Sequence, residues 1–250
     1  GIGGLSEEIE SAVEDLDRSS TFSEYLTRDF TTNMGAIGVS NTWLINEKSY
    51  FKNTIALMGQ EVGFRNDTIN VESGDPTTVN DERYVNNRLS YAGYYSYKFN
   101  PKVTLKAGAY ASQLYYDLRQ DSLSFSDFET TTSLDTDGNA FLLQPWFQFR
   151  YRPNLRWTFN VGLHSMFFTL NNTSSVEPRL GIQYLVDDRQ TLSFAYGLHS
   201  RIVPIGTYFT QVTNAAGNTT QPNEDLELIK SHHLVLAYDY RFSDTWRFHA

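Results

Sequence analysis

Cysteine is absent from the 250 residues, so the chain has neither a disulfide framework nor thiol chemistry. No apolar run approaches the ~20 residues that a membrane-spanning helix needs. Residues 1–20 show no basic start followed by an apolar stretch, so we expect no signal peptide there. The net charge of −9 argues against nucleic-acid binding, because phosphate contacts need clustered lysine and arginine. A large β domain remains compatible with this composition.

What the chain does contain is a strict alternation of apolar and polar residues. In the stretch RLSYAGYYSYKFNPKVTLKAGAY, residues 88–110, Leu89, Tyr91 and Tyr95 alternate with mostly small or charged residues, and the alternation resumes after the turn at Asn100-Pro101 with Val103 and Leu105. The pattern recurs from residue 33 to the end and predicts about ten β-strands.

Strand and connection lengths narrow the architecture. The predicted strands run to roughly 10–15 residues, longer than the usual strand of a globular protein. Tight turns rich in Asn, Asp and Pro alternate with long polar connections, which we predict at Asn66–Glu82, Arg119–Asn139 and Arg201–Glu227. Short turns at one end and long loops at the other are typical of outer-membrane barrels. A soluble β-sandwich, with its apolar face buried between sheets, is the alternative.

The alternation also predicts which solvent each face meets. We expect an all-β, antiparallel, up-and-down transmembrane β-barrel in which the apolar side chains face lipid, with aromatic rings at the interface beside the short turns. The outer set includes Tyr91, Tyr95, Phe147, Phe159 and Phe194. The opposite face should line a lumen, and its charges either pair with one another and with a plug or mark a substrate path. The lumen-facing set includes Arg88, Arg150, Arg179 and Arg241.

The first residues depart from this pattern. We interpret residues 1–32 as an acidic extracellular loop segment and residues 33–250 as the barrel strands with their turns and loops. Ser6 is a candidate helix N-cap followed by Glu7 and Glu8 in the first turn, where the helix dipole favours acidic residues. This predicts a short acidic helix.

One stretch resembles a known family. Residues 176–209 contain Glu177-Pro178-Arg179-Leu180-Gly181, then Tyr196-Gly197-Leu198-His199-Ser200, Pro204 and Tyr208-Phe209. This pattern is similar to the barrel of TonB-dependent outer-membrane receptors, in the branch with an N-terminal carboxypeptidase-regulatory-like domain. Residues 38–54 are similar to another hairpin of these barrels. The resemblance covers most of residues 33–250 and concerns barrel architecture.

The resemblance implies a larger whole. Family members have a 22-stranded barrel, an N-terminal plug and a TonB box, so we expect this chain to be a partial barrel without its plug. The implied location is the bacterial outer membrane. The implied partners are outer-membrane lipid, a plug and the TonB energy-transducing complex engaged through the missing N-terminal part, and a nutrient ligand such as a glycan, peptide or metal chelate. No cofactor is implied. The alternative function is that of a passive outer-membrane porin.

The long loop after residue 200 contains the candidate ligand contacts. Exposed aromatics on a long loop suggest binding, because water offers them no stabilisation. Arg201, Tyr208, Phe209 and Asn214 could together stack on and hydrogen-bond a sugar or peptide. A loop that packs on itself is the alternative. We predict no catalytic and no metal-binding residue, since neighbouring pairs such as His164-Ser165 and His232-His233 point to opposite faces of a strand.

Overall fold

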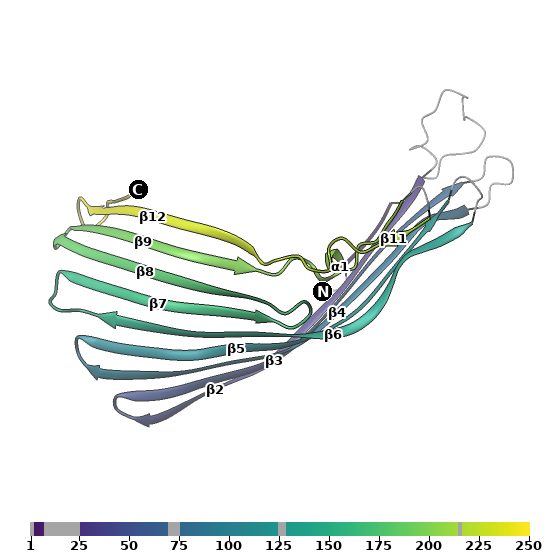
Figure 1. Ribbon diagram of the computed structural model, residues 1–250. Coiled ribbons are helices and arrows are strands. Elements are labelled where there is room, and N and C mark those ends of the chain that lie inside the picture. The colour runs from purple at the N-terminus through teal and green to yellow at the C-terminus, as the bar shows by residue number, and fades with distance from the viewer. Residues whose placement is uncertain (1–2, 8–25, 70–75, 125–128, 215–216) are drawn as a thin grey trace.

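The computed structural model describes residues 3–7, 26–69, 76–124, 129–214 and 217–250. An 11-stranded antiparallel sheet in the order β1-β2-β3-β4-β5-β6-β7-β8-β9-β12-β13 makes up most of the chain (Figure 1). Its strands are β1 Gly3–Glu7, β2 Leu26–Asn46, β3 Ser49–Ile69, β4 Pro76–Asn100, β5 Val103–Leu123, β6 Thr130–Tyr151, β7 Trp157–Phe168, β8 Thr173–Asp187, β9 Gln190–Arg201, β12 Ile229–Arg241 and β13 Arg247–His249. Neighbours in sequence are neighbours in space, which confirms the predicted up-and-down topology.

Five short turns join strands at one end of the sheet, and the same chemistry recurs in each. The Asn100 side chain accepts hydrogen bonds from the backbone of Lys102 at 2.8 Å and Val103 at 3.0 Å. A polar side chain that bonds its own backbone two residues on stabilises a tight turn. The equivalent acceptors in the other turns are Asn46, Asn154, Asp187 and Ser243. This short-turn end matches the sequence prediction.

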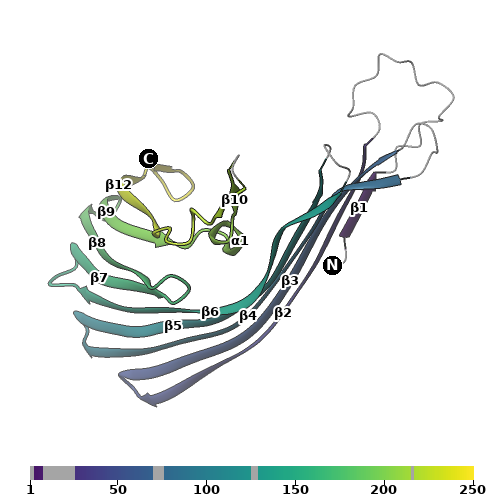
Figure 2. The same ribbon diagram turned by 45° about the vertical axis from the view of Figure 1, so that its right-hand side comes forward.

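Next to these turns, the convex face of the sheet is apolar and uncovered. Trp43 is 67% exposed and Leu236 75% exposed, and in the described part of the chain no second sheet packs on this face (Figure 2). Rings stack along it, with Trp157 lying 4.4 Å from Tyr184 and Tyr240 4.3 Å from Phe242 between centroids. A soluble β-sandwich would bury these side chains. The face therefore suits lipid.

Two of the predicted long loops are mostly strand, which corrects the sequence interpretation. β3 continues to Ile69 and β4 resumes at Pro76, so most of Asn66–Glu82 is paired. β5 and β6 likewise extend through most of Arg119–Asn139. The residues are polar because they lie on a face that meets water, and antiparallel pairing still satisfies their backbone groups. β2–β6 reach 21–25 residues, against 12–15 for β7, β8, β9 and β12.

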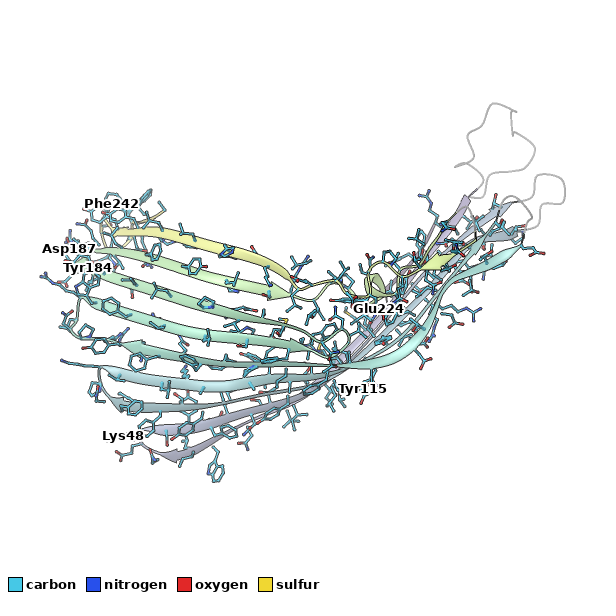
Figure 3. The ribbon with its side chains drawn as sticks, viewed as in Figure 1. Lys48, Tyr115, Tyr184, Asp187, Glu224 and Phe242 are labelled. Atoms are coloured by element: carbon cyan, nitrogen blue, oxygen red, sulfur yellow. The ribbon has the colours of Figure 1, made fainter. Side chains whose placement is uncertain are left out.

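The apolar face changes sides along these long strands. A row of cross-strand partners, called here the boundary row, marks the change: Gly35, Gly59, Asn87, Tyr115 and Asn139. On the short-turn side the outer neighbours include Ile37, Leu57 and Leu89. Beyond it the outer residues are charged, and the inner ones become apolar. Figure 3 shows Tyr115 where the long strands bend.

Beyond the boundary row the outer face carries ion pairs. Arg83 bonds Glu61 at 2.8 Å and Asp117 at 3.0 Å, and all three side chains are exposed. The inner face there is buried, with Leu118 1% and Leu134 8% exposed. We call this part of β2–β6 the extension.

The connection from β9 to β12 covers the inner face of the extension. It contains α1 (Ile205–Tyr208) and the small hairpin of β10 (Val212–Thr213) and β11 (Thr219–Thr220). α1 lies inside the curve of the sheet in both ribbon views. Its residues pack on two buried clusters, Ala140–Leu142–Met166–Phe168–Leu228 and Tyr116–Leu118–Leu134. No helix in the described ranges is both long and apolar enough to cross a membrane.

The N-terminal region differs from the prediction where it is described. Residues 3–7 form β1, paired with residues 28–32 of β2, so Ser6 and Glu7 lie in a strand rather than at a helix start. β2 begins at Leu26, before the predicted boundary at residue 33. Most of the predicted helix lies outside the described residues.

Candidate ligand site on the concave face

The four predicted ligand residues all lie in or next to the β9–β12 connection, in different surroundings. Tyr208 is 1% exposed, with its ring 5.7 Å from that of Phe168. Phe209 lies 5.2 Å from the ring of Tyr116. Both rings therefore anchor the connection to the wall of the sheet. Arg201 and Asn214 remain exposed, and the Asn214 side chain accepts a hydrogen bond from the Asn218 backbone at 3.0 Å within the β10–β11 hairpin.

A cavity of about 760 Å³ lies between the start of this connection and the inner wall. Its wall side includes Met58, Asn86 and Arg88, and its loop side runs from Arg201 to Ile205. A second cavity of about 680 Å³ lies on the other side of α1, between Phe209 and Leu118. The β9–β12 connection thus divides the space on the concave side of the extension into two compartments. Each has a size typical of small-molecule sites.

The four lumen-facing arginines all occur on the concave face but have different partners. Arg88 donates to Ser112 Oγ at 2.9 Å, and Arg150 to Thr104 Oγ1 at 3.4 Å. Arg179 bonds Glu177 at 3.1 Å, and Arg241 is exposed at the short-turn end. Arg179 thus pairs with another lumen charge, whereas Arg88 and Arg150 form no ion pair among the described residues; the choice between pairing, including contacts with a plug, and a substrate path stays a prediction.

Glu177 is the most buried charge on this wall, at 1% exposure. One carboxylate oxygen accepts from Ser175 at 3.0 Å, and the other contacts His164 Nδ1 at 2.9 Å and Arg179 at 3.1 Å. A buried carboxylate needs such partners, because an unpaired buried charge is costly. The network fixes the positions of His164 and Arg179 at the rim of a further cavity of about 660 Å³.

Sequence reasoning missed an aromatic ladder on the polar face. Tyr50 and Tyr94 have ring centroids 5.9 Å apart, Tyr94 and Trp146 5.8 Å, and Trp146 and Tyr110 6.2 Å. Lys106 Nζ lies 5.7 Å above the Tyr94 ring. The sequence did contain a signal for this ladder. Its aromatic residues stand at positions of the alternation that otherwise hold polar residues, and a water-filled lumen by itself does not explain aromatic side chains there.

The ladder connects two cavities that follow the wall toward the short turns. The 660 Å³ cavity contains Trp146 and Tyr110, and a cavity of about 450 Å³ contains Tyr50 and Lys106. Gln148 and Asn160 line both, so the two spaces adjoin. The 450 Å³ cavity is also lined by Lys48, Lys98 and Arg150, together with the acid Glu47. None of its four cations forms an ion pair within the described ranges. The inner wall thus presents rings and positive charge.

A metal site does not emerge from these residues. Among the residues that the structure describes, no group of three or more His, Asp or Glu side chains is arranged to hold a metal ion. The concave face offers groups for hydrogen bonding, stacking and charge pairing.

No protein-family profile and no curated protein matches the sequence. Solved structures do match. The copper transporter OprC aligns at TM-score 0.59 and 12% identity, over 86% of this chain and 37% of its own. The RagAB peptide transporter aligns at TM-score 0.58 and 11% identity, over 88% of this chain and 29% of its own. BauA, the ferric preacinetobactin receptor from Acinetobacter baumannii, aligns at TM-score 0.50 and 12% identity, over 88% of this chain and 36% of its own.

These structures are outer-membrane TonB-dependent receptors with β-barrel architecture, so the chain has the fold of part of such a barrel. It spans 29–37% of the length of the three structures. The resemblance drawn from the sequence is confirmed at the level of the fold. The N-terminal carboxypeptidase-regulatory-like domain stays a prediction.

Proposed function

We propose that this chain forms part of the barrel wall of a TonB-dependent receptor in the bacterial outer membrane, which takes up a scarce nutrient actively. The observation that carries the proposal is the concave face. A connection packed on the inner wall encloses cavities at the extension end, and an aromatic and cationic wall continues from there toward the short turns. A receptor requires a ligand-binding site at its outer end and a path along which the ligand then moves inward.

In this proposal the β9–β12 connection holds the ligand by its position. Tyr208 and Phe209 fix the connection to the wall, whereas Arg201 and Asn214 are exposed at its surface, where a ligand can contact them. The ligand is a glycan, peptide or metal chelate that enters from the extension end. A plug and the TonB complex, supplied by the rest of the protein, would release it inward.

Uptake by cells that produce the full-length protein tests this function. Radiolabelled tripeptides, oligosaccharides and ferric chelates would be supplied singly, with and without a proton uncoupler. Active uptake predicts that one class accumulates against its gradient and that the uncoupler abolishes this. A passive porin would give a flux that the uncoupler leaves unchanged.

A matched pair of variants tests the part played by the connection. Tyr208→Ala removes a buried anchor, and Thr210→Ala changes an exposed residue two positions away. We expect the first to lower uptake severalfold with normal membrane insertion, and the second to have no effect. Equal uptake by both variants would contradict a role for the anchored connection.

A further inference from the structure

We propose that Arg88 and Arg201 bind a carboxylate group of the ligand in the 760 Å³ cavity beneath the β9–β12 connection. The inference rests on the proposed function, since it names the chemistry of the ligand that the receptor would carry. One side chain in this cavity, Arg88, uses only part of its hydrogen-bonding capacity.

Arg88 projects from β4 onto the concave face, where its Nη2 donates to Ser112 Oγ at 2.9 Å. Its Nε is buried and has no hydrogen-bond partner in the described part of the chain. A buried donor without a partner costs about 1–3 kcal/mol, and more for a charged group. The Nε–H of Arg88 can therefore donate a hydrogen bond to an acceptor on a bound ligand.

The charges around the cavity point to the sign of that acceptor. Among the residues that the structure describes, Arg88 and Arg201 are the only charged ones that line it. Within the described ranges neither forms an ion pair, and the nearby acid Glu61 lies on the opposite face with Arg83. The chain as a whole has a net charge of −9, so composition does not explain a purely cationic cavity. An anion would neutralise both groups.

The remaining lining describes the rest of the ligand. Gln60 and Asn86 offer amide groups, and Met34, Met58 and Leu114 offer apolar surface. A guanidinium presents a planar fork of donors that matches the two oxygens of a carboxylate. The site therefore fits a carboxylate on a body that combines amide or hydroxyl groups with apolar surface. A peptide C-terminus and a sugar acid both meet this description.

Binding to the purified full-length receptor in detergent distinguishes these sources. Isothermal titration would compare N-acetyl-trialanine with its C-terminal amide, and glucuronate with glucose, at neutral pH. We expect at least one acid to bind, and its neutral counterpart to bind at least about tenfold more weakly, because only the acid neutralises the two arginines. The arm that responds identifies the ligand class.

Two arginine variants locate the effect. Arg88→Gln removes the charge inside the cavity, and Arg83→Gln removes the same charge from the opposite face of β4, outside the cavity. We expect Arg88→Gln to weaken binding of the acid by roughly 10- to 150-fold, the range for a hydrogen bond to a charged group. Arg83→Gln should leave binding unchanged. Arg201→Gln provides an independent second test if Arg88→Gln fails to fold.

The outcomes are distinct. Failure of both acids to bind, equal binding of acid and neutral compound, or equal loss in the Arg88→Gln and Arg83→Gln variants would overturn the carboxylate site. This binding assay needs no membrane energy, whereas the uptake assay does. Loss of energised uptake with intact acid binding would therefore overturn the proposed function and not the site, and the converse holds.

Discussion

The same strands, β2–β6, run through the part of the sheet near the short turns and through the extension, but their apolar residues lie on opposite faces in the two parts. On the short-turn side of the boundary row, apolar residues such as Ile37 and Leu57 cover the convex face and are exposed. In the extension, apolar residues such as Leu118 and Leu134 cover the concave face and are buried. β2–β6 pass through both parts. At about 3.3 Å per residue, each of these strands is roughly 70–80 Å long.

The difference shows that the solvent, not the strand, decides which face is apolar. A bilayer requires an apolar band only about 25 Å tall. Beyond that band the outer face meets water, so exposed pairs such as Arg83–Glu61 replace the apolar side chains. The inner face of the extension instead receives the β9–β12 connection, and burial there follows the rules of a soluble core. β7 ends at Phe168, opposite Leu142 and before the boundary row, and makes room for that connection.

The largest effect should come from the core of the extension. Leu118→Ala removes a side chain that is 1% exposed and should destabilise the packed connection by about 2–5 kcal/mol. Asp117→Ala, on the opposite face of the same strand, should cost about 0–1 kcal/mol, because its ion pair with Arg83 is exposed. Hydrogen exchange of residues 202–211 in the full-length protein would measure both. Equal exchange in the two variants would show that the inner face is not a core.

A charge placed toward lipid tests the other part of the comparison. Phe147→Arg puts a cation on the convex face and should cost roughly 2–4 kcal/mol in a bilayer. Gln148→Arg, one residue on and facing the lumen, should be far milder. Refolding titrations into vesicles give both free energies. Similar penalties at the two positions would remove the distinction between the faces.

Alkaline pH should give the smallest effect. Burial, with a hydrogen bond to Glu82 at 2.9 Å, raises the pKa of Tyr84 on the inner face of the extension to about 12. The stability from this group is full below pH 10 and declines as pH rises through 10 toward 12, by at most about 1–2 kcal/mol. Absorbance titration of the full-length protein against Tyr84→Phe would show the delayed ionisation. A difference spectrum that titrates near pH 10 would place Tyr84 in water.

The sequence predicted the part near the short turns well and the extension poorly, for a physical reason. Alternation with turn residues at Asn100 and Asp187 suffices to predict strands, turns and faces. In the extension, exposed residues such as Asp117 and Asp135 resemble a polar loop, although Tyr116 and Leu118 keep the period of two. The shift of the apolar residues from the outer to the inner positions of the alternation was the signal that the sequence offered.

The candidate site could be predicted only in parts. Arg88 was assigned to the lumen and Arg201 to the ligand, yet no spacing rule joins residues so far apart in the chain. They line one cavity because the β9–β12 connection folds back across β3, β4 and β5. The burial of Tyr208 depends on that same folding, so a ring that looked free in the sequence is an anchor.

The four tryptophans of the chain are divided unequally between the two faces. Trp43, Trp157 and Trp246 lie near the short turns with 67%, 36% and 74% of their surface exposed, whereas Trp146 belongs to the ladder on the concave wall. The chain therefore carries two populations of intrinsic fluorophore. Quenchers attached to lipid tails would reach the first population, and only solutes inside the barrel would reach Trp146. Its emission reports the occupancy of the path without any introduced label.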